Sequence, residues 1–276
     1  MSYKFQPGML YRMPTHFGPA LGLRQGPDGR SFAPDTRECT AWSVSFLTNQ
    51  EQLEKLLPEG MEVRGEPVVT VEAKYMTNIK WLAGRGYNVL GVSFPAVFNG
   101  KVDHVAGSFL LVMWESLFDP IMTGREEIGW SKIYAEIPQP RTYNGETHCT
   151  ANWLGFKFVD LKVNNLRQVS LEEFAASQGK QTDDGILHYK YIPKTGEWGE
   201  ADVAYATLTP PWLHQVTQEV WEGEGTVEFH QATWEDLPTQ VSIVNAFQAL
   251  EIKEYRGAKM IKTIEGDDIR NQRILH

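Results

Sequence analysis

Short apolar runs separated by turn residues constrain the fold of this chain more than any other feature. The runs predict strands at 40–47, 68–76, 91–97, 107–114, 147–158, 187–192, 201–208 and 226–230, with closing strands at 250–255 and 259–264. Asn99-Gly100, Asn144-Gly145 and Thr195-Gly196 are typical of hairpin turns. Strands and helices do not alternate regularly, which argues against a TIM barrel or a dinucleotide-binding fold. The pattern predicts a mainly β fold, a mostly antiparallel barrel or sandwich.

A few short helices are expected between the strands. Residues 48–51 and 170–173 have the spacing of capping boxes, in which a side chain and a backbone N–H bond each other across the first turn. A third helix is predicted at 237–247. Residues 1–36 are rich in Gly and Pro and read as an irregular arm lying over the body. Because no repeat or low-complexity linker occurs, a single domain over residues 1–276 is expected.

The acidic net charge argues against nucleic acid as a partner. The formal net charge is −9 at pH 7, so the surface repels phosphate backbones. The start of the chain lacks the apolar run of a signal peptide, and no stretch reaches the ~20 apolar residues of a membrane span. The two cysteines, Cys39 and Cys149, form no CxxC pair. A cytoplasmic protein without a membrane partner is the natural expectation.

Motifs for metals and cofactors are absent from the sequence. There is no P-loop, HExxH, GxSxG or EF-hand loop, and no GxGxxG follows a strand. The nearest approach to metal-ligand spacing is His148-Cys149, whose side chains would point to opposite faces of a strand. Neither a metal nor a cofactor is therefore expected.

The segment from Gly124 to Ile133 carries the chemistry. Lys132 is flanked there by Ile128, Trp130 and Ile133, so it could lie in an apolar wall. Burial would lower its pKa, and a neutral amine attacks a ketone to form an iminium that accepts electrons. On residue type alone, a lysine beside a tryptophan is more often a surface residue lying along the ring.

The spacing of this segment resembles the active-site segment of acetoacetate decarboxylases. That segment reads Gly-Arg-Glu, five residues, then Lys-Lys, and here five residues separate Glu126 from Lys132. Weaker similarities occur at 37–38, 53–63, 71–72, 95–99 and 234–238. The resemblance implies a cone-shaped, mainly antiparallel β-barrel that encloses the lysine, usually in a homo-oligomer. In that family the lysine is activated by desolvation or a neighbouring cation.

Two positions depart from the family pattern. The second lysine of the pair is Ile133, so burial alone would have to activate Lys132. A family glutamate aligns with Val89, beside Tyr87 and Asn88, so a carboxylate near the lysine is lost. Tyr87 or Asn88 could replace it, Tyr87 as an acid or base.

The resemblance also assigns roles to other residues. Glu72 would position water or a proton near the iminium, and Arg37 would bind the substrate carboxylate. Trp130 would form a wall of the pocket. Arg125 could either brace the loop or supply positive charge to the pocket.

Three functions remain open from the sequence. The first is a lyase that decarboxylates acetoacetate or a related β-keto acid through a Schiff base on Lys132. The second is an aldolase-dehydratase that condenses pyruvate with aldehydes through the same iminium. The third is a non-catalytic barrel that binds an apolar ligand, which the nine tryptophans also fit.

Overall fold

The computed structural model describes residues 7, 11–12, 20–21, 25–26, 28–30, 32, 36–177, 183–212, 214–266 and 271–276. The predicted arm at 1–36 lies largely outside them. The strands are β1 (Tyr11–Arg12), β2 (Ala20–Leu21), β3 (Arg37–Leu47), β4 (Met61–Val63), β5 (Val68–Ile79), β6 (Arg85–Asn99), β7 (His104–Glu115), β8 (Lys132–Tyr134), β9 (Arg141–Tyr143), β10 (Glu146–Trp153), β11 (Phe156–Val169), β12 (Gly185–Pro193), β13 (Ala201–Thr209), β14 (Val216–Phe229), β15 (Glu254–Glu265) and β16 (Arg273–Ile274). The helices are α1 (Gln50–Glu54), the 3-10 turn η1 (Lys80–Leu82), α2 (Phe118–Met122), the π-helix η2 (Thr123–Ile128), α3 (Leu171–Ser177) and α4 (Val241–Gln248).

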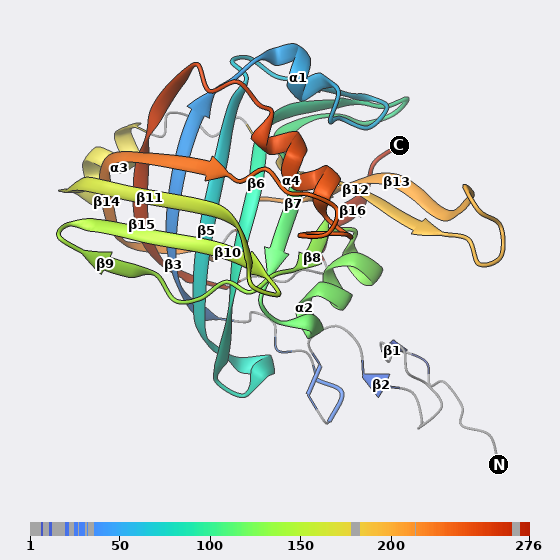
Figure 1. The fold of residues 1–276 in the computed structure, drawn as a ribbon. Helices are drawn as coiled ribbons and strands as arrows, with labels where there is room; N and C mark the ends of the chain where they lie inside the picture. Colours follow the sequence, from blue (N-terminus) through green and yellow to red (C-terminus); the bar gives the residue numbers. More distant parts are fainter. Residues whose placement is uncertain are drawn as a thin grey trace.

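One large curved sheet forms the body of the molecule (Figure 1). Its strands pair in the order β16-β13-β12-β7-β6-β5-β3-β15-β14-β11-β10-β9, while β4 pairs with β6 and β8 with β7. Most pairs are antiparallel, but β7 is parallel to both β12 and β8. The fold is therefore the mainly β class that the sequence predicted, with few helices. No helix in the described ranges is long and apolar enough to cross a membrane.

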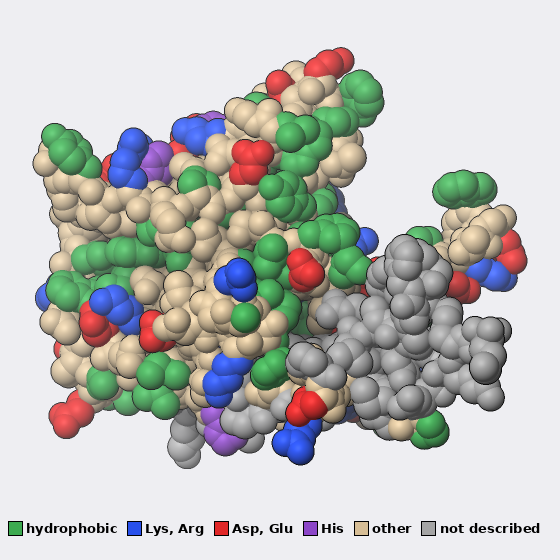
Figure 2. Space-filling model, turned by 90° about the horizontal axis from the view of Figure 1, so that it is seen from below, with side chains coloured by type: hydrophobic (Ala, Val, Ile, Leu, Met, Phe, Trp, Pro, Cys, Tyr) green, Lys and Arg blue, Asp and Glu red, His purple; other side chains and the backbone are tan. Residues whose placement is uncertain are grey.

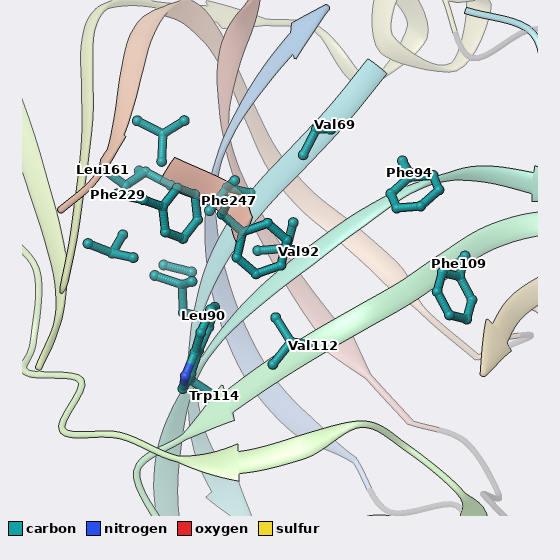
Figure 3. Close-up of a cluster of buried hydrophobic side chains, with 14 of the residues drawn as sticks. Val69, Leu90, Val92, Phe94, Phe109, Val112, Trp114, Leu161, Phe229 and Phe247 are labelled. Carbon is teal, nitrogen blue, oxygen red and sulfur yellow. The ribbon is translucent and has the colours of Figure 1, made fainter. Parts of the chain in front are cut away.

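The main hydrophobic core fills one face of this sheet (Figure 3). Alternate residues of β5, β6 and β7, such as Val71, Leu90 and Trp114, point into it and are fully buried. The indole N–H of Trp114 donates to Gln240 Oε1 over 2.7 Å, which satisfies its polar atom inside the core. Helix α4 closes this side through Val244 and Phe247.

The intervening residues of β5, β6 and β7 lie on the opposite face. Met76, Tyr87 and Val89 form a smaller apolar cluster there with Cys39 and Ile79. The sheet thus separates two compartments, and Lys132 belongs to the second. Lys132 is buried on that second face, at the wall of a cavity, while apolar side chains fill the first face.

Several predicted boundaries were wrong for identifiable reasons. The expected strand at 147–158 is a hairpin, because the chain turns at Leu154 and Gly155, whose φ angles are 46° and 91°. A leucine in the left-handed region gives no turn signal in the sequence. Residues 250–253 are not a strand, and the rest of the two expected closing strands belongs to one strand, β15, with a bulge beside Gly257. Helix α1 is capped by Asn49, whose side chain accepts from Glu51 N, rather than by Thr48.

The surface carries charges of both signs without one dominant patch on the face shown in Figure 2. Basic side chains are scattered among acidic and hydrophobic ones there. That face offers no basic stripe of the kind that binds a phosphate backbone.

Candidate active site

Local structure presents Lys132 at the start of a short strand. The π-helix η2 ends at Ile128 and is followed by Gly129, whose φ of 82° turns the chain back toward the sheet. Strand β8 then pairs in parallel with β7, with Lys132 opposite Met113. The Arg125 guanidinium donates to the Lys132 carbonyl over 2.9 Å and holds this return in place.

The Lys132 side chain is buried, and its amine interacts with a carboxylate, a backbone carbonyl and an aromatic ring. Its Nζ lies 2.7 Å from Glu115 Oε1, and Lys132 and Glu115 are only 5% and 1% exposed. The same nitrogen donates to the Pro120 carbonyl over 3.2 Å and lies 5.0 Å from the centre of the Trp130 ring. Burial disfavours an isolated ammonium, whereas the carboxylate and the ring face stabilise it.

Gly124 is the glycine of the Gly-Arg-Glu segment, and the Lys132 side chain packs directly over it. A Cβ built at Gly124 would lie 2.2 Å from Lys132 Cδ and 2.6 Å from Cε. A side chain at this position would therefore push Lys132 aside. Close approach, rather than an unusual backbone angle, explains this glycine.

Glu115 supplies the carboxylate that the sequence lacks at Val89. In the register between β6 and β7, Val89 lies directly opposite Glu115, so both side chains share the face that carries Lys132. Reasoning from the sequence missed Glu115 and proposed Tyr87 or Asn88. A signal was available, because Glu115 directly follows the predicted strand 107–114.

His188 forms the floor beneath Trp130. The two rings stack with centroids 4.9 Å apart, and His188 Nε2 hydrogen-bonds Thr209 Oγ1 over 2.8 Å. His188 is fully buried. Burial, and then Lys132, lower the pKa of His188 to about 3. Its imidazole is therefore neutral at ordinary pH and fixes the Trp130 wall.

A second charged cluster joins β3, β5 and the end of β15. Arg37 contacts Glu265 over 3.0 Å, and Lys74 contacts Glu72 over 3.1 Å and Glu265 over 3.9 Å. Arg37 also lies over the Trp212 ring at 4.6 Å. Burial raises the pKa of Glu265, but Lys74 and Arg37 together hold it below its usual range. Glu72 raises the pKa of Lys74, burial opposes this, and Glu265 adds to the increase.

A cavity of about 460 Å³ connects Lys132 with this charged cluster. Five of the predicted site residues line it: Arg37, Glu72, Tyr87, Trp130 and Lys132. Lys74, Glu115 and Glu265 also line it and were not foreseen. Glu265 is 133 positions beyond Lys132 by number and stands in a strand of ordinary alternation, so the sequence offers no signal for it.

Two predicted site residues lie elsewhere. Asn88 points away from the cavity and donates to the Ile137 carbonyl over 2.7 Å, because adjacent strand residues face opposite sides. Arg125 is not among the residues that line the cavity and holds the Lys132 backbone instead. The structure therefore places Asn88 outside the lining of this cavity, and it places Arg125 where the loop-bracing alternative expected it.

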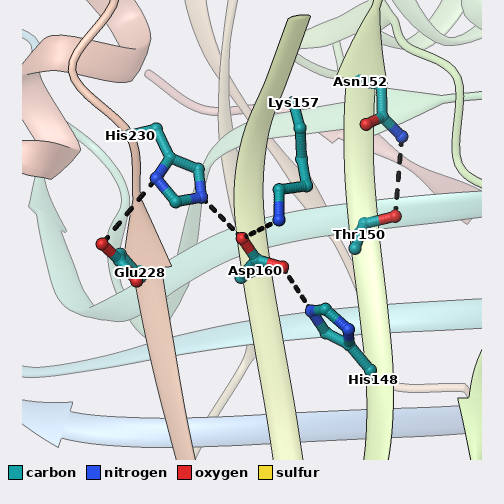
Figure 4. A network of polar contacts seen from close by, with 7 residues as sticks. All are labelled: His148, Thr150, Asn152, Lys157, Asp160, Glu228 and His230. Atoms are coloured by element: carbon teal, nitrogen blue, oxygen red, sulfur yellow. Dashed lines mark hydrogen bonds and ion pairs between the residues drawn. The ribbon is translucent and has the colours of Figure 1, made fainter.

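A polar network on another part of the sheet involves His148, which the sequence showed beside Cys149. His148 and His230 both bond the Asp160 carboxylate, His230 over 2.6 Å, and Lys157 contacts it over 2.6 Å (Figure 4). Cys149 points into the core, as strand alternation predicts. Within the described residues, no group of three His, Cys, Asp or Glu side chains could hold a metal.

Known proteins resemble this chain in sequence and in fold. A family model described as Acetoacetate decarboxylase (ADC) matches residues 12–266. The acetoacetate decarboxylase of Clostridium botulinum (strain Eklund 17B / Type B) is 22% identical over 212 residues, which cover 72% of this chain and 77% of that protein. The acetoacetate decarboxylase structure from Legionella pneumophila subsp. pneumophila str. Philadelphia 1 is 20% identical, with a TM-score of 0.68 over 96% of this chain and 92% of that one. The enduracididine biosynthesis enzyme MppR, solved with pyruvate, is 16% identical, with a TM-score of 0.65 over 92% and 96%.

Proposed function

This chain belongs to the acetoacetate decarboxylase family, and from that premise we propose that it is a carbon–carbon lyase that forms a Schiff base through Lys132. The substrate proposed is acetoacetate or a related β-keto acid, which loses CO2. A homo-oligomeric state and a cytoplasmic location remain predictions from the sequence.

One observation carries the proposal: a buried lysine amine in contact with a carboxylate at the wall of a cavity. A nucleophilic lysine must lose its proton before it attacks a carbonyl. Glu115 lies 2.7 Å away and can take that proton. The transfer turns an ammonium–carboxylate pair into an amine–carboxylic acid pair, which has no separated charges and suits a buried site.

The reaction then follows from the two groups. Lys132 Nζ attacks the β-carbonyl carbon, and the resulting carbinolamine loses water as Glu115 returns its proton to the leaving oxygen. The carboxylate stands β to the iminium carbon, so its C–C bond electrons flow to nitrogen as CO2 leaves. The enamine takes a proton at carbon, and water then hydrolyses the new iminium to the ketone and free Lys132.

Aldol condensation with dehydration is the second candidate, and Glu115 favours it. That reaction needs a base to remove a proton from the carbon next to the iminium, followed by an acid to expel water. A carboxyl group in contact with the reacting nitrogen can serve both steps. MppR, a relative of similar fold, was solved with pyruvate.

Borohydride reduction tests the proposed Schiff base. The protein is incubated with acetoacetate or pyruvate, reduced, digested and analysed by mass spectrometry. An adduct on Lys132 and its loss in Lys132→Ala are expected. CO2 release from acetoacetate alone supports decarboxylation, and an enone from pyruvate plus an aldehyde supports the second candidate.

Lys190 provides the matched control, because it is a lysine of the same region that does not line the cavity. Lys190→Ala should keep the adduct on Lys132. If a panel of keto acids leaves Lys132 unmodified while the protein is folded, the Schiff-base function is wrong and binding of an apolar ligand becomes the better account.

A further inference from the structure

Gly91 occupies the middle of the cavity floor. The strand registers align Glu72 with Gly91, Gly91 with Met113, and Met113 with Lys132, so the four lie in one row across β5, β6, β7 and β8. All four line the cavity. Three strand spacings separate the Cα atoms of Lys132 and Glu72 by roughly 14 Å. Gly91 is the position in this row that has no side chain.

The backbone does not need glycine at this position. Gly91 has no left-handed φ, and a Cβ built on it would meet its nearest neighbours, Leu110 Cδ1 and Met113 Cε, at 3.5 and 3.7 Å. These are ordinary van der Waals distances. By contrast, a Cβ at Gly86 or Gly107 would lie 1.9 or 2.2 Å from a carbonyl oxygen. Packing explains those two glycines but not Gly91.

A glycine inside a strand weakens the strand, and such positions often mark the close approach of a ligand. The space above Gly91 has apolar walls, among them Val89, Leu110 and Ile186. At its far end, Arg37 and Lys74 already contact carboxylates. An apolar part of a substrate therefore fits the middle of the cavity better than a charged part does.

We propose that the cavity accepts a carbonyl substrate with an extended apolar substituent, and that Gly91 is the residue that admits this substituent. The inference rests on the proposed function, because it places the carbonyl at Lys132. The substituent lies over Gly91, between Lys132 and the charged cluster. A cavity of about 460 Å³ is in the range that holds drug-sized ligands, well above what acetoacetate fills.

A substrate-length series tests the inference. Release of CO2 is measured for acetoacetate and 3-oxooctanoate with the wild type, Gly91→Ala and Gly91→Leu. The wild type should prefer 3-oxooctanoate by about tenfold or more in kcat/KM, as expected for several methylene groups in a fitted pocket. Gly91→Leu should remove that preference and still give the Lys132 adduct with acetoacetate. Gly91→Ala should reduce the preference by a smaller factor.

Val97→Leu is the matched control, because Val97 lies on the same strand and does not line the cavity. It should leave the preference unchanged. Thermal melting establishes that each variant is folded, and Gly91→Ala answers the question if Gly91→Leu does not fold. An equal loss for both substrates, or a wild type without preference for the longer one, would overturn the inference.

A binding arm separates this inference from the proposed chemistry. Isothermal titration with butanoate and octanoate, which lack the keto group, needs no Schiff base. Octanoate should bind more tightly to the wild type, and Gly91→Leu should weaken its binding. Absence of a Lys132 adduct with any keto acid refutes the proposed function alone. Equal binding of the two acids refutes the role of Gly91 even when Lys132 is modified.

Discussion

At the scale of single residues, the proposed chemistry depends on proton transfer from Lys132 to Glu115, whose side chains are in contact. A neighbouring cation at position 133 would repel an ammonium, but Ile133 is there instead. The structure provides a carboxylate at 2.7 Å in its place. We therefore propose that Glu115 activates Lys132 by accepting its proton, in place of repulsion from a neighbouring cation.

Replacing Glu115 by Gln tests this account. The amide keeps the shape and can still bond Lys132, but it cannot take or return a proton. We expect kcat to fall by about 10²- to 10⁴-fold, the range for loss of an acid–base group. Borohydride reduction should still place an adduct on Lys132 at longer times. Steady-state kinetics over a range of pH, together with timed trapping, make the measurement.

Glu126→Gln serves as the control for that experiment. Glu126 lies in the π-helix η2, is exposed and does not line the cavity. Its replacement should leave kcat within about twofold. Full activity of Glu115→Gln would assign the proton transfer to another group and contradict the role proposed for Glu115.

At the scale of elements, three antiparallel strands are joined by the Asp160 network. His148 is on β10, Asp160 on β11, and Glu228 precedes His230 at the end of β14. Burial raises the pKa of Asp160, but the bonds from Lys157, His230 and His148 lower it by more, so that the pKa is about 2. The ionised carboxylate therefore stabilises the native pairing of these strands.

Asp160→Asn should lower the free energy of unfolding by about 1–2 kcal/mol at pH 7, because charge-assisted bonds are lost. The folded pKa lies below the unfolded value of ~3.9. The contribution is therefore present above that value and is lost as the pH falls through about 2. Urea denaturation at pH 7 and near pH 2.5 measures the difference between variant and wild type, which should shrink at the lower pH.

Glu228→Gln is the control in the same network. Glu228 is 73% exposed and contacts His230 over 3.7 Å, so its loss should cost less than about 0.5 kcal/mol. An Asp160→Asn variant as stable as the wild type at pH 7 would show that the network contributes nothing to strand pairing.

At the scale of the whole molecule, the sequence predicted the fold class more completely than it predicted the residues of the site. Apolar runs located β5, β7, β12 and β13, and each of these strands has a Gly-containing turn near one end. The register that aligns Lys132 with Met113, Gly91 and Glu72 is set by pairing over long sequence separations. Local patterns do not contain it.

The same limit explains which site residues were foreseen. Lys132 was found from the spacing of its own segment, and Arg37 and Glu72 from the family pattern. Glu265 reaches the cavity because β15 pairs with β3, which places Glu265 opposite Arg37. Asn88 lies outside the cavity lining because one step along a strand reverses the face, which an alignment of sequences does not show.

The buried His188 makes the stability of the whole chain depend on pH. Its pKa is about 3 in the folded state, because burial and then Lys132 disfavour the imidazolium, against ~6.5 in the unfolded chain. Below pH 6.5 the unfolded state takes up a proton that the native state does not. The free energy of unfolding must therefore decrease as the pH falls from ~6.5 toward 3, by up to about 1.4 kcal/mol per pH unit from this residue.

His188→Gln removes that proton from the balance. The variant can still bond Thr209, which lies 2.8 Å from His188 Nε2, although lost stacking on Trp130 should make it less stable at pH 7. Between pH 6 and 4 its stability should decrease less steeply than that of the wild type, by about one proton in the slope.

Urea denaturation at half-unit steps of pH measures both curves. His104→Gln, at an exposed histidine, is the control variant. Parallel curves for His188→Gln and the wild type would mean that His188 takes up a proton in the folded protein as well. The statement that a neutral imidazole lies beneath Trp130 would then be wrong.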